Sequence, residues 1–169
     1  KGQLRRVDEA TFKRLAKANI GVLSKYRFKT IVTADPHAFH VLKNEYPDFG
    51  GNFEVEHHTQ LLARLVESGS LLLDSDASNG TVTYHDSCYL GRYNGEYEAP
   101  RYLLKQLGFE LKEMERSGYR SRCCGGGGGA PVTDIPGEKR IPDIRMEDIK
   151  GTQADVVDVG CPQCQLTVA

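Results

Sequence analysis

The chain has 169 residues, and its 22 basic and 23 acidic side chains leave a formal charge of −1. This length suits one domain with a hydrophobic core of its own, and the balanced charge argues against nucleic acid as a partner. Hydrophobic residues make up 39% of the chain, but no apolar run approaches the roughly 20 residues that a membrane-spanning helix needs.

Short β-branched runs alternate along the chain with segments whose apolar residues recur at helical spacing. The expected strands are 29–34, 53–57, 81–85, 109–114 and 155–159. The expected helices are 8–26, 36–46, 59–67, 99–107, 144–150 and a terminal helix that starts at Pro162. Polar residues at 74–80 and the prolines within 130–143 predict surface loops.

This alternation predicts an α/β fold built on a doubly wound parallel sheet, with helices on both faces. Ligands of such sheets bind beyond the carboxyl ends of the strands. Cys88 follows one expected strand and Cys161 follows another. We therefore expect the cysteines to lie at the carboxyl ends of strands, along one edge of the sheet.

The sequence also contains an internal repeat. Residues 19–38 align without a gap with residues 145–164, which sets the tetrapeptide D-P-H-A against C-P-Q-C. We expect two pseudo-repeated halves, a cysteine-free half at 1–75 and a second half at 76–169 that carries every cysteine. The first half then keeps the shape of a site whose thiols it lacks.

The cysteines occur as a single residue, an adjacent pair and a C-x-x-C motif. They are Cys88, Cys123, Cys124, Cys161 and Cys164, with 34 residues between the first two and 36 between Cys124 and Cys161. Five thiols cannot all pair in disulfides, and no secretory signal pattern opens the sequence. We expect a cytoplasmic, reducing setting, in which clustered cysteines indicate metal or redox chemistry.

Thiolates are soft ligands that suit zinc, copper(I) and iron–sulfur clusters. A C-x-x-C motif with Pro162 at a strand-to-helix turn would serve a structural zinc site. The adjacent pair is harder to reconcile with one ion, because neighbouring side chains point apart and five thiolates exceed the tetrahedral preference of zinc. A 4Fe-4S cluster needs at least four thiolates and could use a fifth. The cluster is the favoured hypothesis, and zinc remains the alternative.

Residues beside the cysteines have expected supporting roles. Gly125 and Gly126 open a run of five glycines, where backbone N–H groups can approach sulfur closely because no Cβ is present. A flexible linker or a phosphate-binding loop would also use glycines, but the Lys-Ser/Thr of a P-loop does not follow. His85 and Asp86 precede Cys88 and are candidates to orient a cysteine ligand through hydrogen bonds.

The spacing of Cys88, Cys123-Cys124-Gly125 and Cys161-Pro162-Gln163-Cys164 resembles the cysteine-rich CCG domain. That domain occurs in the B-type component of heterodisulfide reductase and in iron–sulfur subunits of glycolate oxidase and lactate-utilisation systems. Segments 84–95 and 123–137 look most like iron–sulfur oxidoreductases that work with electron-transferring flavoprotein and in dimethylglycine-type demethylation. The resemblance covers nearly the whole chain.

The resemblance implies a subunit of an oxidoreductase that binds a 4Fe-4S cluster through its five cysteines. In the best-understood member the cluster is non-cubane, and cubane and non-cubane forms both stay open here. Relatives usually carry a second module with its own C-P-H-C, but Asp35 and Ala38 take the places of those cysteines in this chain. The half at 1–75 should therefore hold no cluster of its own, and the half at 76–169 should bind the one cluster.

On this resemblance, electrons would pass between an electron-transferring flavoprotein or flavin dehydrogenase and a further acceptor, either quinone or a disulfide. Other subunits or domains of the same oxidoreductase are expected partners. Relatives carry ferredoxin-like and membrane segments upstream, so we expect this chain to be a fragment of a longer iron–sulfur protein, with membrane association through those segments or through partners. A structural zinc-binding assembly module without a redox role is the alternative function.

Overall fold

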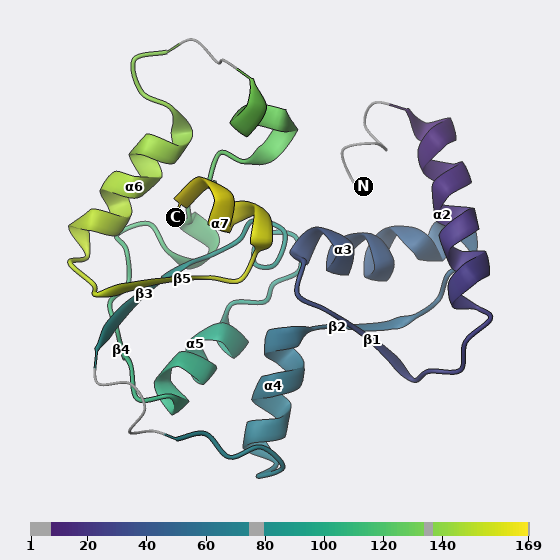
Figure 1. The fold of residues 1–169 in the computed structure, drawn as a ribbon, viewed down its shortest axis with the longest axis horizontal. Coiled ribbons are helices and arrows are strands. Elements are labelled where there is room, and N and C mark those ends of the chain that lie inside the picture. The colour runs from purple at the N-terminus through teal and green to yellow at the C-terminus, as the bar shows by residue number, and fades with distance from the viewer. Residues whose placement is uncertain (1–7, 75–79, 134–136, 169) are drawn as a thin grey trace.

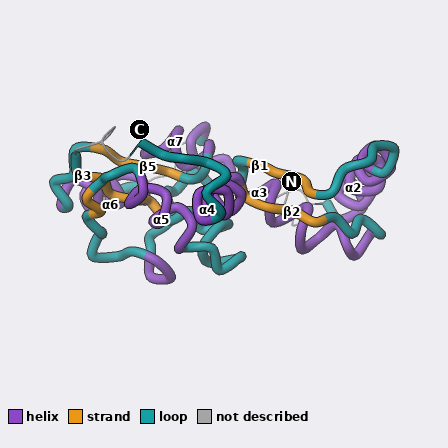
Figure 2. The backbone as a smooth tube through the Cα atoms, turned by 90° about the horizontal axis from the view of Figure 1, so that it is seen from below, coloured by secondary structure: helices purple, strands orange, loops and turns teal. Residues whose placement is uncertain are grey.

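The computed structural model describes residues 8–74, 80–133 and 137–168, and it has a mixed α/β architecture with two parallel sheets (Figure 1). Residues 8–74 contain a two-stranded sheet and are called the two-stranded part below. Residues 80–133 and 137–168 contain a three-stranded sheet and are called the three-stranded part. Figure 2 shows the two sheets side by side along the long axis of the molecule.

The two-stranded part alternates helices and strands. Its elements are α2 (Glu9–Leu23), β1 (Thr30–Thr33), α3 (Pro36–His40), a π-helical turn (Val41–Glu45), a 3₁₀ turn (Tyr46–Phe49), β2 (Glu54–His57) and α4 (His58–Glu67). Strands β1 and β2 run parallel, with Thr33 opposite His57 at their carboxyl ends. Phe12 and Ala16 of α2 pack in a buried cluster with Val41, which fixes this helix against the turn that follows α3.

The three-stranded part follows the same alternation. Its elements are β3 (Thr81–His85), α5 (Glu98–Gln106), β4 (Glu110–Leu111), two 3₁₀ segments (Gly118–Arg120 and Gly127–Val132), α6 (Ile141–Gly151), β5 (Val156–Val159) and α7 (Pro162–Val168). The strand order is β4-β3-β5 and every pairing is parallel. His85 at the end of β3 lies opposite Val159 at the end of β5, so the segments after these strands leave the sheet at the same edge.

Contacts between α4 and α5 join the two parts (Figure 1). Gln60 Nε2 donates a hydrogen bond to Glu96 Oε2 at 2.6 Å. A second polar contact joins Asn44 Nδ2 to Asn94 Oδ1 at 2.7 Å. The parts are therefore held together by hydrogen bonds as well as by helix packing.

The mixed α/β class with parallel strands agrees with the expectation from sequence. The strands are divided between two sheets, however, so the expectation of a single sheet is wrong, because the pattern of strands and helices does not specify which strands pair. The doubly wound arrangement of pseudo-repeated halves stays a prediction. The strand expected at 109–114 is short and covers Glu110–Leu111, while the last internal helix starts at Ile141 rather than at 144. Most of the expected polar loop at 74–80 lies outside the described residues.

Within the described segments, none of the helices is both long enough and apolar enough to cross a lipid bilayer.

Candidate metal centre

The five cysteines meet at the carboxyl edge of the three-stranded sheet. Cys88 lies three residues beyond β3 and Cys161 lies two residues beyond β5, as the alternation of strands and helices predicts. Cys124, Cys161 and Cys164 are buried in one apolar cluster with Met114 and Ile149. Cys88 and Cys123 are partly exposed, so the site is closed on one side and reaches the surface on the other.

The thiols form a continuous chain of contacts. Cys88 contacts Cys123, Cys123 contacts Cys124, Cys124 contacts Cys164, and Cys164 contacts Cys161. These contacts between side chains connect residues from three distant stretches of sequence. The structure therefore brings together all five of the cysteines that the sequence singled out.

Protons are shared unevenly along this chain of thiols. Hydrogen bonds donated by neighbouring thiols lower the pKa of Cys88 to about 7 and that of Cys161 to about 4. The pKa of Cys124 also falls well below its usual range, because Cys123 and Cys164 both bond to it. The donors Cys123 and Cys164 have raised pKa values for the same reason, together with burial. The site thus stabilises thiolates, the form that binds metals.

Backbone N–H groups of the glycine loop donate hydrogen bonds to the sulfur atoms of the adjacent cysteines. Gly125 N lies 3.3 Å from Cys123 Sγ, and Gly126 N lies 3.4 Å from Cys124 Sγ. Gly125 has a φ of +80°, and a Cβ at this position would lie 2.5 Å from Pro142 Cδ. Only glycine combines this left-handed conformation with such a close approach. The N–H groups of both glycines therefore point to cysteine sulfur, and their supporting role at a bound cluster stays a prediction.

Pro162 opens α7 directly after Cys161. The fixed φ of proline suits the first turn of a helix. Backbone N–H groups of Gln163 and Cys164 bond to the Cys161 thiol and help to lower its pKa. The first turn of this helix therefore holds a thiolate in the position of a helix cap.

His85 is fully buried and lies beside two of the buried thiols. Ligand-type atoms of His85, Cys124 and Cys164 all lie within 4.8 Å of one another, and His85 is bonded to the Cys124 thiol. His85 Nδ1 accepts a hydrogen bond from Arg145 Nε at 2.9 Å. Because an arginine N–H only donates, Nδ1 carries no proton, and the neutral ring must hold its proton on Nε2.

Arg145 was not predicted as a site residue from the sequence, and it is the largest fully buried side chain of the described residues. Its guanidinium also donates to Arg116 O at 3.0 Å, to Ser121 Oγ at 3.1 Å and to Asp148 Oδ2 at 3.3 Å. Burial lowers the pKa of Arg145, and the pairing with Asp148 opposes this. Its surroundings in the sequence, Arg145-Met146-Glu147-Asp148, resemble an ordinary exposed helix face, so no local pattern marks it.

The Asp86 carboxylate takes part in a separate network. Arg101 Nη1 and Nη2 donate to its two oxygens at 2.7 and 2.9 Å, and Gly118 N donates to Oδ2 at 2.7 Å. The backbone oxygen of Asp86 accepts a hydrogen bond from Ser121 Oγ at 3.3 Å. Asp86 thus anchors the segment that leads into Cys123, and its effect on a cysteine ligand stays a prediction.

The two-stranded part also reaches the thiols, through His37. Ligand-type atoms of Asp35, His37 and Cys161 lie within 4.8 Å of one another. Asp35 and then Cys161 raise the pKa of His37 to about 9, because both bond to the imidazole. The D-P-H-A turn aligns with the C-P-Q-C turn in the sequence, but the meeting of the two turns in space was not predicted.

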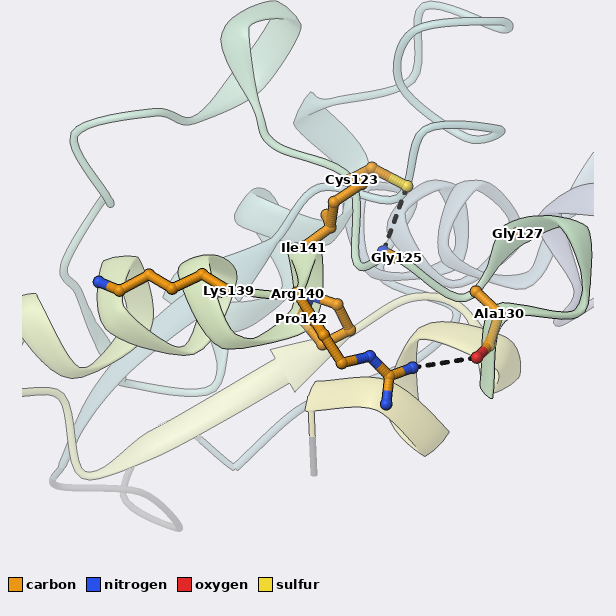
Figure 3. Close-up of a pocket in the computed structure, with 8 residues that line it drawn as sticks. All are labelled: Cys123, Gly125, Gly127, Ala130, Lys139, Arg140, Ile141 and Pro142. Atoms are coloured by element: carbon orange, nitrogen blue, oxygen red, sulfur yellow. Dashed lines mark hydrogen bonds between the residues drawn. The ribbon is translucent and has the colours of Figure 1, made fainter. Parts of the chain in front are cut away.

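A cavity of about 290 Å³ lies against Cys123 and the glycine loop (Figure 3). Figure 3 shows the thiol of Cys123 at one end, with Arg140 donating to Ala130 O at 3.0 Å on the far side. Lys139 points away and pairs with Glu147 at 2.7 Å. The thiol of Cys123 is thus accessible from this side.

The donor set fits an iron–sulfur cluster. Five soft thiols in mutual contact exceed what one tetrahedral ion needs, and N–H groups of Gly125 and Gly126 point toward sulfur. Cys88, Cys123, Cys124, Cys161 and Cys164 are the residues that would hold such a group.

The fold and the site define a cysteine-rich α/β protein whose thiols gather beyond the strands of a parallel sheet. A protein-family model of the CCG cysteine-rich domain matches residues 82–169, and the chain belongs to this family. The expected resemblance to CCG proteins is confirmed. No solved structure matches the chain.

Curated relatives match most of this chain with a minor share of their own length. A probable membrane-anchored ferredoxin of Chromohalobacter salexigens is 62% identical over 93% of this chain and 24% of its own. EtfAB:quinone oxidoreductase of Syntrophomonas wolfei is 38% identical over 96% of the chain and 24% of its own. A component of the dihydromethanophenazine:CoB–CoM heterodisulfide reductase of Methanosarcina barkeri is 36% identical, with coverage of 89% and 38%.

Proposed function

We propose that this chain is an iron–sulfur electron-transfer domain of an oxidoreductase that carries a 4Fe-4S cluster. The observation that supports this most strongly is the continuous contact of five thiols from three separate segments at one sheet edge. Thiolates gathered at a largely buried site, here Cys124 and Cys161, are costly unless they are neutralised. A bound cluster supplies one-electron redox chemistry, and the donor set suits it.

The chain's own residues would have distinct roles around the bound group. All five cysteines bind it, and the N–H groups of Gly125 and Gly126 donate to the sulfur of Cys123 and Cys124. His85 contributes its Nε2–H from within the core, in the tautomer that Arg145 fixes. Each N–H near sulfur stabilises added negative charge, and such hydrogen bonds tune a cluster's reduction potential. The non-cubane form is part of this proposal.

The partners we propose follow the names of the relatives. Electrons would pass between an electron-transferring flavoprotein or flavin dehydrogenase and a quinone or disulfide acceptor, because relatives include an EtfAB:quinone oxidoreductase and a component of a heterodisulfide reductase. Other subunits or domains of the same oxidoreductase would be neighbours. A cytoplasmic location with membrane association through further segments or partners is in keeping with the membrane-anchored name of another relative.

The division into halves is also a proposal. The half at 76–169 would bind the cluster, and the cysteine-free half at 1–75 would be its pseudo-repeat within a doubly wound design. Supporting this, β1 leads through Asp35 and Pro36 into α3 just as β5 leads through Cys161 and Pro162 into α7.

Zinc is the second candidate, because His85, Cys124 and Cys164 offer three ligand-type atoms within 4.8 Å. The hydrogen bond from Arg145 opposes this role for His85. It occupies Nδ1 and leaves the proton on Nε2, so neither ring nitrogen offers a free lone pair to an ion. A zinc site at Cys124 and Cys164 would therefore have to do without His85.

The test is a metal and sulfide analysis of the chain purified without oxygen. The proposal predicts iron and acid-labile sulfide in equal amounts, visible absorbance that bleaches on reduction, and loss of both in Cys124→Ser. Ser87→Ala, which alters a buried hydroxyl next to Cys88, is the matched control and should keep the iron. One zinc per chain without sulfide would refute the redox function.

A further inference from the structure

The Asp35-Pro36-His37 turn of the two-stranded part lies against Cys161. His37 Nδ1 lies 3.2 Å from Asp35 Oδ1, and Asp35, His37 and Cys161 bring their ligand-type atoms within 4.8 Å of one another. Figure 1 shows α3 and α7, the helices that begin at these turns, approaching each other near the centre of the molecule. His37 is thus the point at which the two-stranded part touches the thiols.

The position of the imidazole is fixed on several sides. Asp35 caps α3 by accepting the backbone N–H of His37 at 2.9 Å, and the same Oδ1 faces the ring. The ring also packs on Tyr89, with centroids 4.2 Å apart. Because Tyr89 directly follows Cys88, His37 is held between the loop of Cys88 and the turn of Cys161.

The partner of Nδ1 decides what the other ring nitrogen can do. A carboxylate only accepts hydrogen bonds, so Nδ1 of His37 carries the proton that bonds to Asp35. A metal that takes the place of the Nε2 proton would meet a lone pair with a carboxylate behind the ring, which is the arrangement typical of a metal-bound histidine. His85 has the opposite tautomer, because its Nδ1 partner is the donor Arg145.

We propose that His37 is a nitrogen ligand, supplied by the two-stranded part, to the iron that Cys161 binds, and that Asp35 orients it. This rests on the proposed function. Imidazole is a suitable ligand for iron, and an Asp35–His37 pair takes the place of a second set of thiols in the D-P-H-A turn. The two-stranded part thereby contributes a ligand to the site rather than a scaffold alone.

The test uses the 169-residue chain, loaded with its cluster without oxygen, reduced, and studied by pulsed electron paramagnetic resonance for direct nitrogen coupling to iron. We expect a strong histidine nitrogen coupling that is lost in His37→Ala. His37→Cys should keep the cluster and lose the coupling. This second variant tests the same ligand if His37→Ala does not fold. His40→Ala is the matched control, because His40 lies on α3 and contacts Tyr89 but bonds to Asn44 and Asn94. It should keep the coupling.

A titration of the metal-free chain with Co²⁺ gives a second readout. Asp35→Asn keeps an acceptor oxygen for the helix cap and for Nδ1–H but removes the negative charge that makes the imidazole a more basic ligand. We therefore expect Co²⁺ affinity to fall about 10–100-fold, as for other residues that support a ligand. The inference would be overturned if the cluster-loaded wild-type chain showed no nitrogen coupling, or if the coupling were lost in His85→Gln rather than in His37→Ala. The proposed function would stand in both cases. A chain that takes up no iron would overturn the proposed function.

Discussion

Replacing Arg145 by methionine tests whether one buried guanidinium fixes the environment of the buried thiols. Methionine fills similar volume and makes no hydrogen bonds. His85 Nδ1, Arg116 O and Ser121 Oγ each lose their donor, whereas Asp148 keeps Arg122 at 2.9 Å. An unsatisfied buried polar atom costs about 1–3 kcal/mol, and methionine removes the cost of burying a charge. We expect a net loss of about 3 kcal/mol in the free energy of unfolding.

The assay is urea unfolding of the metal-free, reduced chain. With a slope of about 2 kcal/mol per molar urea, the midpoint should fall by about 1.5 M. Arg140→Met is the matched control, because its exposed side chain makes one hydrogen bond, to Ala130 O, and it should cost less than about 1 kcal/mol. Nitrogen NMR of His85 should show the proton on Nε2 in the wild type and both tautomers in Arg145→Met. Equal losses in the two variants, or an unchanged tautomer, would refute the reasoning.

Three further outcomes can be measured on the same chain. Gly125→Ala should lower the free energy of unfolding by about 1–2 kcal/mol for its φ of +80° alone, and by more through the contact with Pro142. Gly127→Ala is the matched control, because a Cβ there meets nothing within 4 Å, and it should be near neutral in urea unfolding. Burial lowers the pKa of His57 to about 4, so folded stability should be lost as pH falls from about 6.5 toward 4, by up to about 3 kcal/mol, and His57→Gln should flatten that dependence. Cys164→Ser removes the thiol that contacts both Cys124 and Cys161, so iron content should fall to background by elemental analysis.

The meeting of the cysteines was predictable because it depends on local order. Strands β3 and β5 were expected where they occur, and parallel strands leave a sheet at the same edge, so Cys88 and Cys161 had to converge. The glycine run likewise carries its own signal, since a left-handed residue such as Gly125 favours glycine whatever surrounds it.

Other parts of the site depend on contacts that no local pattern encodes. Arg145 bonds to His85 across 60 residues of sequence, and its charge in the sequence is typical of an exposed helix face. His37 has the sequence context of a histidine at the start of a helix, and only the approach of the two parts brings it to Cys161. The division of the strands between two sheets was also missed, because periodicity identifies strands without specifying their partners.

The equivalence of Asp35 and Cys161 in the repeat we propose shows why aspartate is compatible with the position of a cysteine. At the start of α7 the Cys161 thiol accepts N–H groups of the first helical turn, and at the start of α3 the Asp35 carboxylate accepts the N–H of His37. Both side chains are anionic acceptors at a helix N-terminus, so the exchange preserves the cap. What changes is the ligand: a thiolate binds a soft metal directly, whereas the carboxylate hydrogen-bonds to the imidazole two residues later. The same strand–turn–helix unit can then contribute sulfur from one part and nitrogen from the other.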